Sequence, residues 1–218
     1  MSICKKRTIF DGIDFSLFKP VDDKLSLRHA LQLPIDRFIL LFVGQVKTGK
    51  GIFDILNAMK LLKTMLPDAE QPLLLIAGLP IDEHTLPEVR AKIQQENLNV
   101  YYLGQRSDVH ALMQACDVLV LPSHEGVEGL PRVIVEAMAC GTVALGTDTS
   151  GLREALTNGN GVMVREKSPD EIAHAIAELM QNADLMRTYQ TKGLAYVKAN
   201  FDVRTNTDAV VNFYKECL

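Results

Sequence analysis

The sequence predicts an α/β protein whose core is a doubly wound, Rossmann-like parallel sheet, followed by a helical C-terminal segment. Short apolar runs alternate with longer segments of helical periodicity along most of the chain. The apolar runs are almost continuous, which is typical of strands buried on both faces of a parallel sheet. Helices cover both faces of such a sheet, and ligands bind at the carboxyl ends of its strands.

Six strands are expected, and FILLFV at 38–43 is the clearest because it is wholly apolar. The other five cover 72–78, 100–104, 117–122, 142–147 and 161–164. A helix is expected at 51–66, where apolar residues recur at helical spacing. Further helices are expected at 87–97, 107–116, 131–140, 169–182, 184–199 and 203–216, and Ser107 is expected to cap the helix at 107–116.

The composition fits a soluble globular protein and excludes several classes. Apolar residues make up 47% of the 218 residues and charged residues 23%, with a net charge of −4. No long basic stripe is present, which argues against a nucleic-acid partner. No apolar run reaches the roughly 20 residues that a membrane span needs. The chain is therefore expected to be cytoplasmic.

The cysteines and histidines do not suggest a metal site. The four cysteines are sparse and have no metal-ligand spacing, so reduced thiols are expected. Cys116 and Cys140 lie among apolar residues and are expected to be small core residues, while Cys4 and Cys217 lie near the termini. The five histidines form no HExxH pattern.

The first candidate loop is GQVKTGKG at 44–51, between an expected strand and helix. It resembles a P-loop, but Gly51 occupies the position where a hydroxyl would hold Mg²⁺, which disfavours an NTPase. Two interpretations remain. Either Lys47 and Lys50 help to bind an anionic group at a helix N-terminus, or the segment is a tight turn with surface lysines.

The second candidate loop, Gly104 to Asp108, indicates little by itself beyond a helix cap. The third is SHEGVEGLPRVIVEAMACG at 123–141. Pro131 fits the first position of a helix and Gly141 fits its end. Glu128 and Glu136 are placed to bracket a polar ligand near the start of that helix. Alternatively, Glu136 forms an ordinary i, i+4 surface pair with Arg132. A glycosidase is disfavoured because both glutamates belong to one loop and helix, whereas hydrolases place two carboxylates across the scissile bond.

Several spaced motifs, taken together, resemble retaining glycosyltransferases of family 4, which have the GT-B fold. The strongest is Glu128-GLPRVIV-Glu136, which follows DVLVLPS and resembles the family's donor signature. FDGIDFSLFKP resembles the interdomain segment, and LLFVGQVKTGKG resembles the first donor loop. VYYLGQRSDVHALMQACDVLVLPS resembles the segment that holds the base, and TDTSGLREAL and NGNGVMV resemble the stretches after the signature. The resemblance covers about residues 9–200 in unbroken order.

The resemblance implies a role for each matching residue. Glu128 would lie beside the donor sugar and Glu136 would bond the ribose hydroxyls. Lys50 would neutralise the diphosphate, so Glu128 and Lys50 are the candidate catalytic residues. The remaining candidate donor-binding residues, which the resemblance places in the two loops and in the base-reading loop, are Gly44, Gln45, Lys47, Gln105, Arg106, Gly129, Leu130 and Pro131. Outside this context, the residues around Gln105 and Arg106 indicate only the start of a helix.

The resemblance also implies the chemistry. A hexosyl unit would move with retention from a nucleoside-diphosphate sugar to an acceptor hydroxyl, with the leaving phosphate taking the acceptor proton. No cofactor is implied, and no metal is expected because no DxD-type pair of acids stands at a strand end. Residues 1–20 would be an interdomain-like segment, and residues 21–218 would be the nucleotide-sugar-binding domain.

Two departures from the family pattern matter. Gln45 occupies the position where the family usually has an arginine, and an amide lacks the charge and the bidentate fork of a guanidinium. Lys47 is the expected substitute. Secondly, the sequence begins at the interdomain segment, so an N-terminal acceptor domain or a partner chain is expected, and any peripheral membrane contact would belong to that other half. The alternative is a non-catalytic nucleotide-sugar-binding or interaction domain.

Overall fold

The computed structural model describes residues 6–217 and contains a six-stranded, wholly parallel sheet. The strand order is β3-β2-β1-β4-β5-β6. The strands are β1 Ile39–Val43, β2 Leu73–Ala77, β3 Val100–Gly104, β4 Val118–Leu121, β5 Val143–Thr147 and β6 Val162–Val164. The doubly wound α/β fold predicted from the sequence is confirmed.

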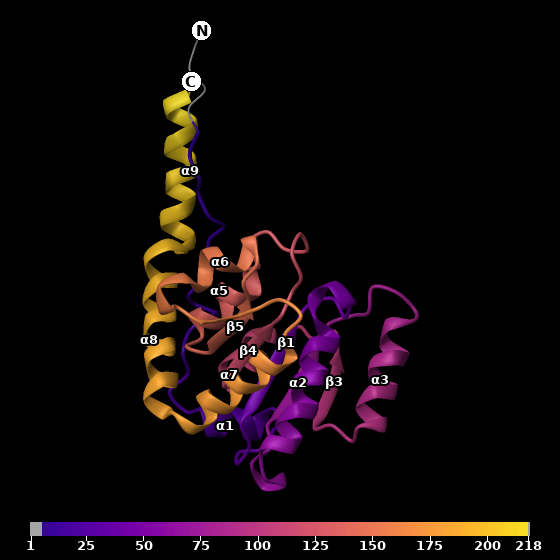
Figure 1. The fold of residues 1–218 in the computed structure, drawn as a ribbon. Helices are drawn as coiled ribbons and strands as arrows, with labels where there is room; N and C mark the ends of the chain where they lie inside the picture. Colours follow the sequence, from indigo (N-terminus) through magenta and orange to yellow (C-terminus); the bar gives the residue numbers. More distant parts are fainter. Residues whose placement is uncertain (1–5, 218) are drawn as a thin grey trace.

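Helices cover the sheet on both sides (Figure 1). The α-helices in the described part of the chain are α1 Lys24–Ala30, α2 Ile52–Met65, α3 Thr85–Gln95, α4 Val109–Ala115, α5 Arg132–Ala139, α6 Ser150–Leu156, α7 Pro169–Gln181, α8 Ala183–Asn200 and α9 Val203–Cys217. α2 packs against α3 and α7, whereas α5 packs against α4 and α8. The chain thus forms two helical layers around one sheet.

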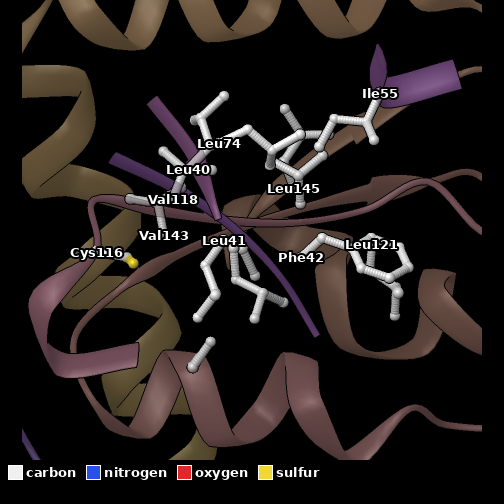
Figure 2. Packing of buried hydrophobic residues seen from close by; sticks show 14 of the residues in the cluster. Leu40, Leu41, Phe42, Ile55, Leu74, Cys116, Val118, Leu121, Val143 and Leu145 are labelled. Carbon is white, nitrogen blue, oxygen red and sulfur yellow. The ribbon is translucent and has the colours of Figure 1, made fainter. Parts of the chain in front are cut away.

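The core lies on both faces of the sheet, which explains the continuous apolar runs. Leu40 and Leu41 of β1 are adjacent and fully buried, and adjacent strand residues point to opposite faces. Figure 2 shows side chains of β1, β2, β4 and β5 packed on either side of the strands. Cys116 and Cys140 are buried free thiols, as expected, whereas Cys4 lies outside the described residues. No helix in the described part is long and apolar enough to cross a membrane.

Some predictions of secondary structure were wrong. The sequence did not reveal α1 or α6, which have only seven residues each. Ser107 does not cap α4, because the N-cap is Asp108, whose side chain makes no capping hydrogen bond. Asp108 instead binds Arg106, so its carboxylate is already occupied.

α1 is tied to the amino-terminal edge of the sheet by one partly buried carboxylate. Asp117 precedes β4 and accepts hydrogen bonds from Lys24 Nζ (2.8 Å), Arg28 Nη2 (2.7 Å) and the Ile39 N–H (2.8 Å). Arg28 is almost fully buried and also donates to the carbonyl of Ala115 at 2.8 Å. These bonds anchor α1 at the edge of the sheet where the strands begin, opposite the edge that holds their carboxyl ends.

The helix α9 extends away from the body of the molecule, and the start of the described chain runs beside its base (Figure 1). Ile13 pairs with Asp202, and the Phe10 and Phe201 rings stack at 4.8 Å. Asn206 Nδ2 donates to the carbonyl of Phe10 at 3.0 Å. No residue of α9 itself is buried.

Candidate functional site

The candidate site lies at the carboxyl edge of the sheet, where the strand order reverses. β1 and β4 are neighbours, but the chain continues from β1 to β2 in one direction and from β4 to β5 in the other. Crossovers between parallel strands are right-handed, so the helices after β1 and β4 lie on opposite faces. In open α/β sheets, ligands bind at the loops that follow such a pair of strands. Both loops are among those that the sequence singled out.

The loop after β1, residues 44–51, is held against the ends of neighbouring strands. The Val46 N–H donates to the Leu79 carbonyl at 2.8 Å. Gly51 has a φ of +73°, and a Cβ there would lie 2.0 Å from the Pro122 carbonyl oxygen. Glycine is thus required at 51 for backbone conformation and for close packing against the loop after β4. The absence of a P-loop hydroxyl at this position has a steric reason.

Lys50 and Glu128, the two candidate catalytic residues, are in direct contact. Lys50 Nζ donates to Glu128 Oε1, and the Ser123 hydroxyl donates to the same oxygen at 3.1 Å. The side chains of Lys50 and Glu128 are only 15% and 12% exposed. The fold therefore joins the two candidate loops through a mostly buried ion pair, and the ammonium group is partnered when no anion is bound.

Gln45 and Lys47 both lie in the loop after β1, but they differ in what they offer to an anion. Gln45 is exposed and carries no charge. Lys47 is partly exposed in extended backbone before the short helix Thr48–Lys50, and it forms no ion pair with any residue in the described part of the chain. Its charge is therefore available, in contrast to that of Lys50. Gly44 lies so close to the next strand that a Cβ on Gly78 would come within 1.8 Å of the Gly44 carbonyl oxygen.

The loop after β4 enters α5 differently from the sequence prediction. Pro131 is the N-cap, with φ −75° and ψ 118°, and not the first helical residue. α5 begins at Arg132, directly after the extended backbone of Pro131. Gly129 is exposed and Leu130 packs against the core. Gly141 ends the helix as predicted, with a φ of +75°.

Glu136 lies on α5 in a partly buried position. Arg132 Nε contacts Glu136 Oε1 at 3.5 Å, so the i, i+4 pair expected from the sequence is present. However, the Glu136 side chain is 13% exposed against 57% for Arg132, so this is not an ordinary surface pair. Burial raises the pKa of Glu136, although Arg132 acts in the opposite direction. A buried carboxylate with one long contact retains acceptor capacity for a ligand.

The loop after β3 holds Gln105 and Arg106. Gly104 has a φ of +66°, and Gln105 is exposed. Arg106 binds the Asp108 carboxylate in two places, Nε to Oδ1 at 2.8 Å and Nη2 to Oδ2 at 2.6 Å. These bonds from Arg106 lower the pKa of Asp108. The Arg106 side chain is occupied by its two hydrogen bonds to Asp108. The backbone of this loop is therefore the part that can contact a ligand.

The sequence interpretation overlooked two pairs that border the site. His124 Nε2 lies 2.7 Å from Asp54 Oδ2, and the Glu125 carboxylate accepts from the Ser150 N–H at 3.0 Å. Neither pair follows a known spacing, because the partners are 70 and 25 residues apart. Only the expectation that loops after parallel strands share one edge would have brought them together.

Comparison with known proteins places the chain among glycosyl transferases. The family model described as "Glycosyl transferases group 1" matches residues 23–194. A D-inositol 3-phosphate glycosyltransferase of Saccharomonospora viridis is 27% identical in an alignment 220 residues long that covers 97% of this chain and 50% of that protein. The putative glycosyltransferase EpsD of Bacillus subtilis is 30% identical over 185 residues, covering 84% of this chain and 47% of EpsD. The chain spans about half the length of the curated relatives it matches.

The fold is shared with solved structures. The crystal structure of Anabaena Alr3699/HepE in complex with UDP superposes with a TM-score of 0.87 and 25% identity, covering 96% of this chain and 57% of that one. The sucrose-phosphate synthase of Thermosynechococcus elongatus gives a TM-score of 0.83 at 27% identity, covering 97% of this chain and 52% of the other.

Proposed function

Because the chain belongs to the glycosyl transferases group 1 family, we propose that it is the donor-binding half of a retaining family 4 glycosyltransferase with GT-B architecture. The donor is a nucleoside-diphosphate sugar, and the transferred group is a hexosyl unit. Anabaena Alr3699/HepE, which has been solved with UDP and with UDP-glucose, supports a nucleotide-sugar ligand for the same fold.

The observation that carries the proposal is the contact between Lys50 and Glu128 at the point where the strand order reverses. A cation from the loop after β1 meets a carboxylate from the loop after β4, directly before a helix N-terminus. The cation suits the diphosphate, and the carboxylate suits the sugar hydroxyls. A nucleotide sugar has these two groups next to each other.

In the proposed reaction, the bond between the anomeric carbon and the diphosphate oxygen breaks. The acceptor oxygen forms the new bond on the same face of the sugar, and the acceptor proton moves to the leaving phosphate. The protein stabilises the negative charge that develops on the diphosphate, through Lys50, Lys47 and the amides before α5. Neither a metal nor another cofactor is part of the proposal.

The roles of the other residues follow from the same proposal. Glu136 accepts hydrogen bonds from the ribose, and the backbone at Gln105 and Arg106 meets the base. Residues 1–20 lead toward an acceptor domain or a partner chain, which supplies the acceptor hydroxyl and any membrane contact. The cytoplasm is the proposed location.

A second candidate function is binding of the nucleotide sugar without transfer. Gln45 favours it, because an uncharged and exposed amide replaces the cation that the family pattern has there. Loss of one charge-assisted contact raises the free energy of the transition state by about 3 kcal/mol, which slows the reaction about 100-fold. The two functions differ in whether sugar is released onto an acceptor when an acceptor domain is added.

Calorimetry with UDP and GDP tests the proposal on the isolated chain. We expect weak binding of at least one nucleoside diphosphate, unchanged in EDTA, and tighter binding of the matching nucleotide sugar. The absence of heat with every common nucleoside diphosphate would overturn the proposal. Binding that disappears in EDTA would overturn its metal-free part.

A further inference from the structure

The segment from His124 to Val127 connects Ser123, at the end of β4, with Glu128. It lies in the loop after β4 and contains Gly126, whose φ is +76°. Within the segment, the Val127 N–H donates to the His124 carbonyl at 3.3 Å. Such a short turn does not fix its own position, so its contacts with neighbouring elements determine where Glu128 is held.

His124 makes two bonds outside its own segment, one to the short helix Thr48–Lys50 that carries Lys50 and one to α2, which follows that helix. Its N–H donates to the Gly49 carbonyl at 2.9 Å, one residue before Lys50. Its Nε2 lies 2.7 Å from Asp54 Oδ2, in the first turn of α2. A carboxylate accepts hydrogen bonds, so this contact suits the histidine tautomer that has its proton on Nε2. The His124 and Asp54 side chains are 18% and 16% exposed, so this is not a solvated surface pair.

Two other residues of the segment, Glu125 and Val127, also contact neighbouring elements. The Glu125 carboxylate accepts from the N–H and the hydroxyl of Ser150, at 3.0 and 2.5 Å, at the start of α6. The Val127 side chain packs so closely on Gly49 that a Cβ there would lie 3.1 Å from it. The segment is therefore fixed to the loop after β1 and to the loop after β5.

We propose that His124, oriented by Asp54, is a positioning residue that holds Glu128 in place for the sugar of the donor. It does not touch the donor itself. Its side chain fixes the segment to α2, and the segment sets the distance between the Glu128 carboxylate and Lys50. This inference rests on the proposed function, since it assigns His124 a part in binding the sugar end of a nucleotide sugar.

The proposal predicts a difference between two ligands. A nucleoside diphosphate lacks the sugar and does not need Glu128, whereas the nucleotide sugar does. His124→Ala is therefore expected to weaken binding of the nucleotide sugar by about 10-fold, which corresponds to about 1.4 kcal/mol, and not to weaken binding of the matching diphosphate. A merely structural role would weaken both ligands equally.

The measurement is calorimetry with UDP-glucose against UDP, and with GDP-mannose against GDP, on the whole chain. His124→Gln keeps a side-chain N–H for Asp54 and is expected to restore most of the lost affinity. Asp54→Ala is expected to reproduce His124→Ala, and the double variant to be no worse than either, because residues of one unit are not additive. His174→Ala on α7, where His174 Nδ1 lies 2.8 Å from the Asp170 carbonyl of its own helix, is the matched control and is expected to behave as wild type.

Hydrogen exchange without ligand tests the same claim independently of the proposed function. The amides of residues 124–128 are expected to exchange at least about 5-fold faster in His124→Ala than in wild type or in His174→Ala. Unchanged exchange would overturn the positioning role, whatever the chain binds. Equal weakening of nucleotide sugar and diphosphate would also overturn it. If the wild type binds neither ligand, the proposed function fails and the assignment of His124 to a donor sugar fails with it.

Discussion

The ammonium group of Lys50 lies against the carboxylate of Glu128, and the two residues come from loops that leave neighbouring strands, β1 and β4. The pair is largely shielded from solvent, so its charges are only weakly screened. Under the proposed function, a diphosphate has to share or displace Glu128 to reach Lys50. The proposal therefore predicts that diphosphate binding competes with a contact inside the protein.

Glu128→Gln is expected to bind nucleoside diphosphate about 5-fold to 10-fold more tightly than wild type, a gain of about 1 kcal/mol, because the variant removes a negative charge that occupies Lys50. The same variant is expected to bind the nucleotide sugar no more tightly than the diphosphate. Calorimetry with UDP and UDP-glucose measures both. Glu88→Gln, at an exposed glutamate of α3, is the control. Weaker diphosphate binding in Glu128→Gln would contradict the competition.

Gln45→Arg is expected to tighten diphosphate binding by about 10-fold, because a charge-assisted hydrogen bond contributes about 1.5–3 kcal/mol. The gain is expected to shrink as the salt concentration rises, because the site is exposed. An arginine at Gln94, an exposed position of α3, is the matched control for added charge. An equal gain from both arginines would show a general charge effect and not a contact at position 45.

Lys47→Ala is expected to weaken diphosphate binding by about 5-fold or more in the wild-type background, because Lys47 has the unpaired charge in the loop after β1. In the background of Gln45→Arg the loss is expected to be smaller, since the arginine supplies the same charge. Titration of both alanine variants with the same diphosphate checks this. Equal affinities of wild type and Lys47→Ala would show that Lys47 does not stand in for the arginine.

Glu136→Gln is expected to stabilise the fold near neutral pH while it weakens nucleotide binding. Burial raises the pKa of Glu136 above its usual value, so folding favours the protonated form. The contribution of Glu136 to stability is therefore fully present below its unfolded pKa and is lost as the pH rises through the folded pKa. The free energy of unfolding of the variant, minus that of wild type, should grow as the pH rises from the ordinary pKa of a glutamate, about 4.3, through the raised pKa of Glu136. Urea denaturation at several pH values measures this difference.

The binding part of this prediction uses the same variant. Loss of a charged acceptor for the ribose is expected to weaken nucleoside-diphosphate binding by about 10-fold or more. Arg132→Gln removes the partner and leaves the carboxylate, and is expected to keep near wild-type affinity. If Glu136→Gln and Arg132→Gln lose affinity equally, Glu136 serves the helix through Arg132 and not the ligand.

Asp117→Asn is expected to lower the free energy of unfolding by about 2 kcal/mol, because it removes the charge that Lys24 and Arg28 share. For a chain of this size, that corresponds to a fall in Tm of about 4–8 °C. Diphosphate affinity is expected to stay unchanged, since Asp117 lies at the opposite edge of the sheet. A variant that keeps its stability but loses affinity would contradict the claim that Asp117 anchors α1 at one edge of the sheet while the ligand binds at the other.

The sequence revealed those parts of the fold that depend on local pattern. The runs at β1 and β2 are apolar because both of their faces are covered, and this pattern is visible without a structure. α1 and α6 were missed because seven residues give less than two full turns of periodicity, and α1 is held by the distant Asp117. Pro131 was placed one position too far into the helix, because proline fits both the N-cap and the first turn.

The site was predictable in its loops but not in its contacts. Glu128 and Lys50 were selected separately from motifs, and their mutual ion pair depends on the neighbouring positions of β1 and β4. His124 was passed over because its partner Asp54 lies in another loop–helix unit. Pairs of this kind arise from the order of strands in the sheet, which motif spacing does not contain.

The exposed helix α9 has a consequence for how the chain melts. A helix of 15 residues that has no buried residue in the described part of the chain gains little from packing, and such helices are marginal in water. Asn206 fixes the first turns of α9 to the body. Heating should therefore give two signals in far-ultraviolet circular dichroism: a shallow, uncooperative loss of helix from α9 at low temperature, and a steep transition of the sheet above it. A two-state fit to the whole curve would then understate the stability of the sheet.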